Sequence, residues 1–144
     1  MLQIPAYKVL LIDDDADDRM LFFKALTSVD PSIPHEYDEN GIFALNTLRS
    51  ADAVLPDYIF LDFNMHRMGG EEFLALLRME EKLKHIPVAV LTTSNLTEHK
   101  IYSQKFGATY FITKPPLCRE LVKAISIVLQ NEKEHAPCEC LTRF

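Results

Sequence analysis

Polar side chains end or follow four short apolar runs in this sequence, and their chemical types are those of a phosphoryl-transfer site. The runs cover residues 9–12, 58–61, 88–91 and 110–113, and each has the length and composition of a buried strand. The polar residues at their carboxyl ends are Asp13, Asp14, Asp62, Thr92 and Lys114. If the runs are strands of one parallel sheet, these side chains meet at a single edge. Three carboxylates, a hydroxyl and an ammonium group gathered there could carry out metal-assisted phosphoryl transfer.

The carboxylates of this set need a counter-charge, and together they suit a divalent cation. Two carboxylates about 4 Å apart repel each other by about 4 kcal/mol at a surface-like dielectric. Mg²⁺ prefers hard oxygen ligands, so it is the cation we expect. A carboxylate can attack phosphorus and hold the phosphoryl group as an acyl phosphate. Thr92 and Lys114 suit the remaining phosphoryl oxygens, because one donates a hydrogen bond and the other is cationic.

Segments with apolar residues at helical spacing alternate with strand-like runs along nearly the whole chain. We expect helices over residues 15–28, 40–50, 70–82, 95–106 and 116–131, and strands over 8–13, 34–38, 58–62, 87–91 and 109–113. This alternation predicts an α/β fold, in which helices cover both faces of a five-stranded parallel sheet. In a doubly wound sheet of order 2-1-3-4-5, the winding reverses between the first and third strands, where Asp13, Asp14 and Asp62 would meet. The sequence alone leaves that strand order open.

Single residues mark several helix ends and faces. Asp15 is a candidate N-cap for the first helix, and Gly107 is a candidate C-cap for the fourth. Pro115 and Pro116 suit the first turn of the last helix, because proline needs no hydrogen-bond donor there. Leu21 belongs to the apolar stripe of the first helix, so we expect it to face the core.

Composition limits the classes of protein that remain. The 144 residues suit one domain, which we expect to cover residues 1–131 and to be followed by a mobile tail, 132–144, too short for an output domain. The longest apolar stretches are about five residues, too short to span a bilayer, and no signal peptide is evident, so we expect a cytoplasmic protein. A net charge of −6 without a basic stripe argues against nucleic-acid binding. Three cysteines without framework spacing argue against a disulfide scaffold.

Four segments of the chain resemble one known family, the receiver domains of two-component response regulators, in their stand-alone, chemotaxis-regulator-like form. The segments are VLLIDDDADDR, PDYIFLDFNMHRMGG, PVAVLTTS and YFITKPP, in this order, and the resemblance covers about residues 7–131. It implies a flavodoxin-like fold and a signalling protein that catalyses only its own phosphorylation and dephosphorylation. The chain departs from the family at His66, where proline is usual, and at Gly69, where aspartate is usual. Both changes are expected to loosen the loop after the third strand.

The resemblance implies a role for each residue of the acidic site. Asp62 would be the phosphoacceptor. Asp13, Asp14 and Asp62 would hold Mg²⁺, together with the backbone carbonyl of Asn64. The phosphoryl donor would be a sensor histidine kinase or a histidine phosphotransfer protein.

The resemblance also implies how the protein would respond to phosphorylation. Thr92 would be the switch hydroxyl that binds the phosphoryl group, Lys114 would pair with it, and Phe111 would be an aromatic switch that turns inward. The bond between Lys114 and Pro115 would be cis. A downstream protein target would dock on the face made by the fourth helix, the fifth strand and the fifth helix.

Structural and functional alternatives stay open at several positions. Asp15, Asp17 and Asp18 suit the N-terminus of a helix, where the dipole favours carboxylates. Thr93 competes with Thr92 as the switch hydroxyl, and Phe111 could be a static core residue. Arg19 is expected to pack or pair at the surface of the first helix.

Rival functions remain as well. The chain could pass the phosphoryl group on as a phosphorelay intermediate. A small phosphatase could use Asp62 as its nucleophile, but it would need a second acid where this chain has Asn64. A flavodoxin-type cofactor carrier would meet an acidic first strand–helix loop, which repels a flavin phosphate.

Overall fold

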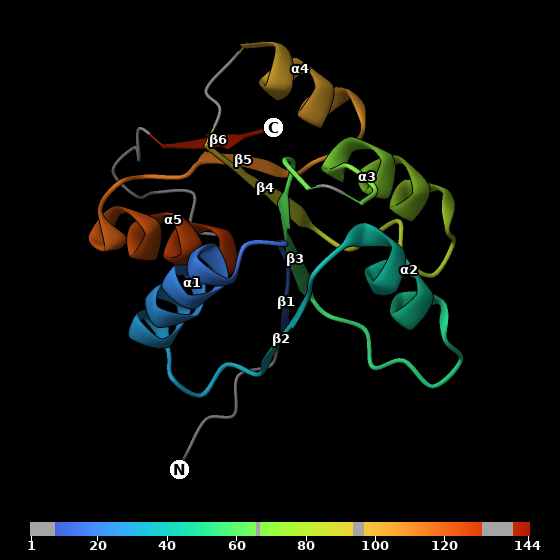
Figure 1. The fold of residues 1–144 in the computed structure, drawn as a ribbon, viewed down its shortest axis with the longest axis horizontal. Coiled ribbons are helices and arrows are strands. Elements are labelled where there is room, and N and C mark those ends of the chain that lie inside the picture. Colours follow the sequence, from blue (N-terminus) through green and yellow to red (C-terminus); the bar gives the residue numbers. More distant parts are fainter. Residues whose placement is uncertain (1–7, 66, 94–96, 131–139) are drawn as a thin grey trace.

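A six-stranded sheet forms the centre of the protein, and helices cover both of its faces (Figure 1). The computed structural model describes residues 8–65, 67–93, 97–130 and 140–144. The elements in chain order are β1 (Val9–Ile12), α1 (Ala16–Val29), β2 (His35–Asp38), α2 (Gly41–Arg49), β3 (Tyr58–Asp62), α3 (Gly70–Met79), β4 (Val88–Thr92), α4 (Thr97–Lys105), β5 (Tyr110–Thr113), α5 (Cys118–Gln130) and β6 (Leu141–Arg143). Among the described residues, no helix is long and apolar enough to cross a membrane.

The strand order in the sheet is β2-β1-β3-β4-β5-β6. The first five strands are parallel, with a helix connecting each to the next along the chain, and β6 runs antiparallel to β5. The predicted α/β class and the order 2-1-3-4-5 are therefore confirmed. The winding reverses between β1 and β3, so the expected site lies beyond the carboxyl ends of these two strands.

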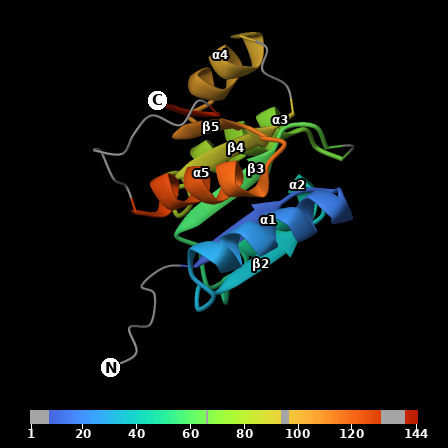
Figure 2. The same ribbon diagram turned by 90° about the vertical axis from the view of Figure 1, so that its left-hand side faces the viewer.

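Alternate residues of the central strands belong to two separate apolar layers, one on each face of the sheet. Val9 and Leu11 of β1 pack toward α1 and α5, whereas Leu10 and Ile12 pack toward α2 and α3. This alternation follows from the two-residue period of a strand. Helices α1 and α5 lie side by side on one face of the sheet, and α2 and α3 lie on the other (Figures 1 and 2). Both faces of the central strands are therefore buried, which explains why the strands read as continuous apolar runs.

Local sequence signals set several helix ends. The Asp15 side chain accepts hydrogen bonds from the backbone N–H groups of Asp17 and Asp18, so the predicted N-cap of α1 is confirmed. Gly107 follows α4 with a φ of 95°, a left-handed conformation that glycine adopts without strain. At Gly70, a Cβ atom would lie only 2.7 Å from the Asp62 carbonyl oxygen. Glycine there lets α3 begin directly against the end of β3.

Several sequence predictions differ from the structure. The last helix begins at Cys118 rather than residue 116, so Pro115 and Pro116 lie before it instead of in its first turn. The third helix ends at Met79, not at residue 82. Leu21, expected in the core, is 52% exposed, because α1 turns its neighbour Phe22 toward the sheet. The expected cis bond before Pro115 is wrong, since the described chain contains no cis peptide bond. Trans is the lower-energy isomer before proline by about 0.5–1 kcal/mol.

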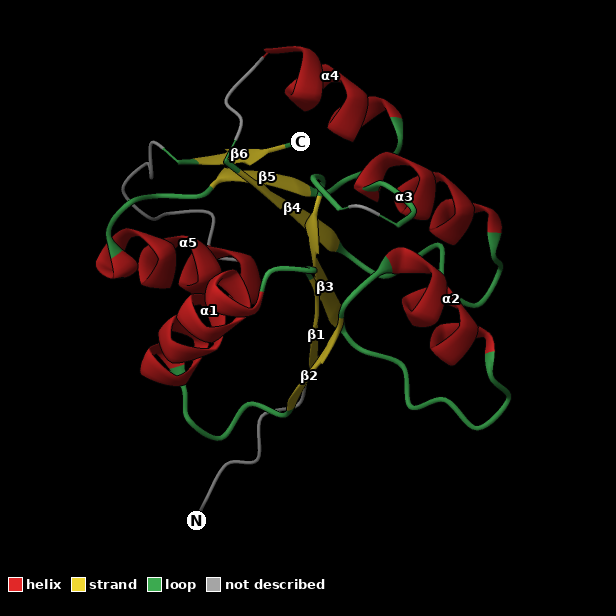
Figure 3. Ribbon diagram, in the orientation of Figure 1, coloured by secondary structure: helices red, strands yellow, loops and turns green. Residues whose placement is uncertain are grey.

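The predicted tail contains a strand that was not expected from the sequence. Leu141–Arg143 form β6, which extends the sheet beyond β5 (Figure 3). An edge strand offers a row of unpaired backbone groups, and β6 satisfies those of β5. Residues 132–139 of the predicted tail lie outside the described residues, as do His66 and the first two residues of the helix predicted over 95–106.

Candidate functional site

Three carboxylates converge at the carboxyl ends of β1 and β3. Strand pairing places Ile12 beside Leu61, so the residues that follow, Asp13 and Asp62, are also neighbours. One oxygen each from Asp13, Asp14 and Asp62 lies within 4.8 Å of the others. The sequence predicted this convergence, and the structure shows it.

Asp13 is fixed by contacts on both its backbone and its side chain. Its carboxylate accepts a hydrogen bond of 2.9 Å from the Asp15 N–H, and its own N–H donates to the Asp38 carbonyl at 3.1 Å. Arg19 Nη1 donates to the Asp13 carbonyl at 2.9 Å. Arg19 also stacks on the Tyr37 ring, 4.5 Å from its centroid. These contacts brace the loop after β1 against β2, so Asp13 is held in one position while only 1% exposed.

Asp62 is a buried carboxylate with a perturbed proton affinity. It is 5% exposed, and its Oδ1 accepts a hydrogen bond of 3.1 Å from the Asn64 N–H. Burial raises the pKa of Asp62 to about 6, and the charges of Asp13 and Asp14 act in the same direction. Lys114 and the Asn64 N–H oppose this rise without cancelling it. Burial is therefore the dominant influence on the proton affinity of Asp62.

Lys114 reaches into the acidic site from the end of β5. Its Nζ lies 2.8 Å from Asp18 Oδ2, 3.1 Å from Asp13 Oδ2 and 3.9 Å from Asp62 Oδ2. Burial alone would lower the pKa of Lys114, but the hydrogen bond to Asp18 and the charges of Asp62 and Asp13 raise it above its ordinary value. Lys114 is therefore a stable cation with three carboxylate partners.

The structure distinguishes the two threonines at the end of β4. Thr92 is fully buried, and its Oγ1 accepts a hydrogen bond of 3.2 Å from Asn64 Nδ2. Its carbonyl accepts the Lys114 N–H at 2.7 Å. Thr93 is exposed. The Thr92 hydroxyl therefore belongs to the site, one strand away from Asp62.

The donor set fits a hard divalent cation. Asp13, Asp14 and Asp62 bring three carboxylates together, and the Lys114 ammonium contacts Asp13, Asp62 and the further acid Asp18. The carboxylates described in this cluster therefore outnumber its one ammonium. Asp13, Asp14 and Asp62 offer oxygen ligands of the kind that Mg²⁺ prefers. The role of the Asn64 carbonyl as a further ligand stays a prediction.

A comparison with known families decides what kind of domain carries this site. The family described as "Response regulator receiver domain" matches residues 9–126. The chain belongs to the response regulator receiver family. Receiver domains bind Mg²⁺ at an aspartate cluster and are phosphorylated by histidine kinases.

Curated relatives of this receiver domain include stand-alone regulators. It is 32% identical to the chemotaxis protein CheY-3 of Vibrio cholerae over 108 residues, which cover 75% of this chain and 80% of that protein. It is 30% identical to the response regulator Rcp1 of Synechocystis over 127 residues, which cover 84% of this chain and 85% of that protein. It spans only 13% of the sensor histidine kinase CheAY of Helicobacter pylori, at 31% identity.

Solved receiver structures share the fold. The phosphorylated cyanobacterial phytochrome response regulator RcpA superimposes with a TM-score of 0.77 at 29% identity, covering 85% of this chain and 90% of that one. The Mn²⁺-bound form of Rcp1 gives a TM-score of 0.76 at 26% identity, covering 91% of this chain and 99% of that one. The flavodoxin-like fold expected from the sequence is therefore confirmed.

One residue of this receiver site was not expected from the sequence. Asp18 suited the helix N-terminus, yet its side chain contacts Lys114. Arg19 packs on Tyr37 and pairs with Glu39 at the surface of α1, as expected, and it also holds the loop after β1. A signal for Asp18 was present. It lies four residues before Phe22 and seven before Ala25, on the stripe of α1 that faces the core, where an unpaired acid is costly.

Phe111 is fully buried and packs in the layer between the sheet and α2 and α3. Lys100 on α4 lies 5.8 Å from the centroid of its ring. The ring already faces inward in this structure. Its role as a moving switch stays a prediction.

Proposed function

We propose that the protein is a single-domain response regulator that accepts a phosphoryl group on Asp62 from the phosphohistidine of a kinase or phosphotransfer protein. One observation carries this proposal. The buried Asp62 carboxylate is surrounded by Asp13, Asp14 and Lys114, with the Thr92 hydroxyl on the neighbouring strand. These groups can hold a phosphoryl group from several sides once it is bonded to Asp62.

The proposed transfer requires the ionised form of Asp62. A carboxylate oxygen forms a bond to phosphorus as the bond between phosphorus and the histidine nitrogen breaks, and the electron pair of that bond stays with the imidazole. The product is an acyl phosphate on Asp62 and a free histidine on the donor. With a pKa of about 6, Asp62 is mostly ionised at neutral pH, so it is available as the nucleophile.

Each neighbour has a separate task in this proposal. Asp13 and Asp14, with Asp62, would hold Mg²⁺, which when bound offsets the repulsion between the acidic site and the incoming phosphoryl oxygens. Lys114 would pair with one phosphoryl oxygen, and Thr92 would donate a hydrogen bond to another. Thr92 would then exchange its contact with Asn64 for one with the phosphoryl group.

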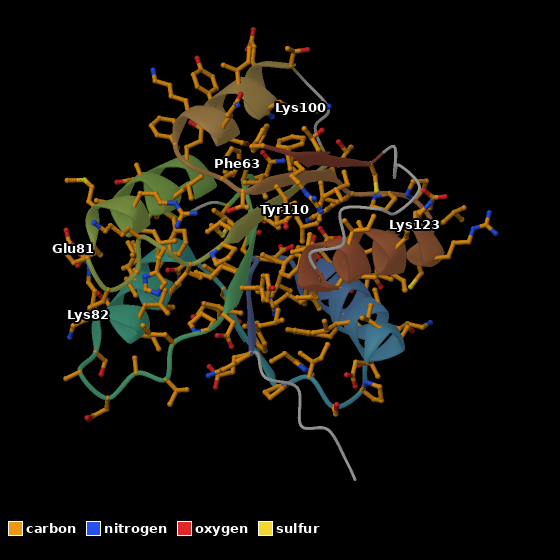
Figure 4. The ribbon with its side chains drawn as sticks, turned by 180° about the vertical axis from the view of Figure 1, so that it is seen from behind. Phe63, Glu81, Lys82, Lys100, Tyr110 and Lys123 are labelled. Carbon is orange, nitrogen blue, oxygen red and sulfur yellow. The ribbon has the colours of Figure 1, made fainter. Side chains whose placement is uncertain are left out.

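The proposed output follows from this exchange at the end of β4, because α4 begins shortly after Thr92. Among the described residues of α4 only Ser103 is buried, so little apolar packing holds this helix in place. Ile101 and Tyr102 are exposed on it, 57% and 44% respectively. A target protein would dock on the face that includes α4, β5 and α5. Figure 4 labels Lys100 on α4 and Lys123 on α5, the helices on either side of β5 and β6.

Labelling with acetyl phosphate in the presence of Mg²⁺ tests the proposed acceptor. The wild-type protein should take up one phosphoryl group, and Asp62→Asn should take up none, because an amide cannot form the acyl phosphate. Asp17→Asn is the matched control, since Asp17 is an exposed acid outside the site. Labelling of Asp62→Asn at the wild-type level would remove Asp62 from the role.

A further inference from the structure

The nearest partner of Lys114 is Asp18, an acid on α1 that the proposed phosphorylation chemistry does not use. Lys114 Nζ lies 2.8 Å from Asp18 but 3.9 Å from Asp62. The contact with Asp18 has hydrogen-bond geometry, whereas the separation from Asp62 is too long for a hydrogen bond. Lys114 Nζ also donates to Asp13 at 3.1 Å, so Asp18 and Asp13, rather than the acceptor, hold the ammonium, and Asp18 is the nearer of the two.

The ion pair between Asp18 and Lys114 is partly shielded from water. The side chains are 35% and 17% exposed. Both line a cavity of about 260 Å³ whose other walls include Leu21, Phe22 and Pro115. Ion pairs in such a setting are stronger than pairs on an open surface, because the effective dielectric is lower.

The helix holds Asp18 in place. The Asp18 N–H donates to the Asp15 side chain at the N-cap of α1. Phe22, one turn further along the helix, is buried against the sheet. The Asp18 carboxylate therefore cannot follow Lys114 far if the ammonium moves toward Asp62. Any such movement has to lengthen or break the contact between Asp18 and Lys114.

We propose that Asp18 is a positioning residue that holds the Lys114 ammonium away from Asp62 until a phosphoryl group draws it across. This inference rests on the proposed acceptor role of Asp62. A phosphoryl group on Asp62 adds negative charge within reach of Lys114, which then exchanges Asp18 for a phosphoryl oxygen. The lost contact makes the modified state less favourable, so Asp18 limits how readily the site is modified.

Beryllofluoride, which binds a carboxylate as a stable mimic of a phosphoryl group, measures this effect without turnover. The chain has no tryptophan, so ¹⁹F NMR of the bound fluorides is a suitable readout. In Asp18→Asn, where the amide holds the ammonium less tightly, the affinity for beryllofluoride should rise about fivefold. Asp18→Glu keeps a carboxylate and should bind with an affinity near that of the wild-type protein.

Asp17→Asn is the matched control for charge. It removes one acid from the same helical turn, and within the described residues no ion pair joins Asp17 to Lys114. Its affinity for beryllofluoride should stay within about a factor of two of wild type, because exposed charges are well screened. An equal rise in beryllofluoride affinity in Asp17→Asn and Asp18→Asn would mean that the net charge of the protein alone sets the affinity. That result would overturn the proposal.

A second readout follows the Lys114 ammonium itself by ¹H–¹⁵N NMR. Its signal should differ between wild type and Asp18→Asn before beryllofluoride is added, and should coincide in the two proteins afterwards, because Lys114 has then left Asp18. Unchanged or weaker beryllofluoride affinity in Asp18→Asn, or an unaltered Lys114 signal in the free protein, would overturn the role of Asp18. If the wild-type protein bound no beryllofluoride, the proposed acceptor role of Asp62 would be wrong instead. The Lys114 signal of the free protein would still test the contact between Asp18 and Lys114.

Discussion

Asn64 Nδ2 donates a hydrogen bond of 3.2 Å to Thr92 Oγ1, which joins the loop after β3 to the end of β4. The Asn64 N–H at the same time donates to Asp62 Oδ1 at 3.1 Å. One residue therefore connects the proposed acceptor with the proposed switch hydroxyl. The Asn64 side chain is exposed, so water can replace Thr92 as its partner at little cost.

Replacing Thr92 should separate its structural role from its role in binding a phosphoryl group. Thr92→Val keeps the shape of the side chain but removes the hydroxyl, so the affinity for beryllofluoride should fall about tenfold, as expected for the loss of one charge-assisted hydrogen bond. The melting temperature of the free protein should change little. Thr92→Ser keeps the hydroxyl and should bind beryllofluoride nearly as well as wild type. Equal affinities of the valine and serine variants would exclude the hydroxyl as a ligand.

The raised pKa of Asp62 predicts a pH dependence of stability without divalent cations. The folded protein binds the Asp62 proton more tightly than the unfolded chain does, because burial raises the pKa from 3.8 to about 6. The free energy of unfolding therefore falls as the pH rises from about 4 to about 6, and the penalty is fully present above this window. In EDTA, Asp62→Asn should gain melting temperature over wild type at about pH 7.5 and gain less at about pH 5.

The comparison with Asp62→Asn isolates Asp62 from other groups. Burial also raises the pKa of Asp38, but Asp38 is present in both proteins and its effect cancels in the difference. The raised pKa of Lys114 acts only at alkaline pH, outside this window. A stability difference between the two proteins that stays constant from about pH 5 to about pH 7.5 would contradict the raised pKa of Asp62.

Mg²⁺ should stabilise the folded protein by relieving the repulsion within the acidic cluster. Free Mg²⁺ at about 100 times its dissociation constant adds about 2.7 kcal/mol to the free energy of unfolding, which appears as a higher melting temperature. Asp14→Ala removes a proposed ligand and should erase most of this rise. Asp17→Asn leaves the three proposed ligands in place and should keep it. If the melting temperature of wild type does not respond to Mg²⁺, the proposed metal site is wrong.

The features that could be predicted from the sequence depend on the pairing of neighbouring strands. The features that could not be predicted depend on packing between elements that are more distant in the chain. Asp13 and Asp62 follow apolar runs, and parallel pairing of β1 with β3 is enough to bring them together. The contact between Asp18 and Lys114 joins residues 96 positions apart, and it depends on how α1 lies against the end of β5. Periodicity within α1 indicates the buried face, apart from Leu21, but not which residue of another element that face meets.

The sixth strand was missed for a related reason. Leu141–Arg143 are too few to show a strand pattern, and their conformation comes from the free edge of β5. The proline-containing sequence before them indicated only a flexible segment. Similarly, no pattern within residues 110–116 reports the isomer of the bond before Pro115, and the expectation of a cis bond came from the resemblance alone.

Two proline substitutions should show whether β6 protects β5 in solution. Thr113 N–H donates to the Cys140 carbonyl at 2.9 Å, and Phe144 N–H donates to the Thr109 carbonyl at 3.0 Å. Hydrogen-bonded pairs alternate along an antiparallel ladder, so Thr142, opposite Phe111, also belongs to such a pair, and Arg143 does not. Thr142→Pro removes a ladder donor and should release β6, whereas Arg143→Pro keeps the donors that face β5.

Hydrogen exchange at two adjacent amides provides the measurement for these variants. The Thr113 N–H faces β6, while the Lys114 N–H donates to the Thr92 carbonyl of β4 at 2.7 Å. In Thr142→Pro, exchange at Thr113 should speed up by at least about tenfold, the equivalent of ~1.4 kcal/mol, while Lys114 stays protected. In Arg143→Pro both amides should stay protected. Equal protection of Thr113 in the two variants would show that β6 does not protect β5, because the loss of a ladder donor in β6 would then leave the edge of β5 unchanged.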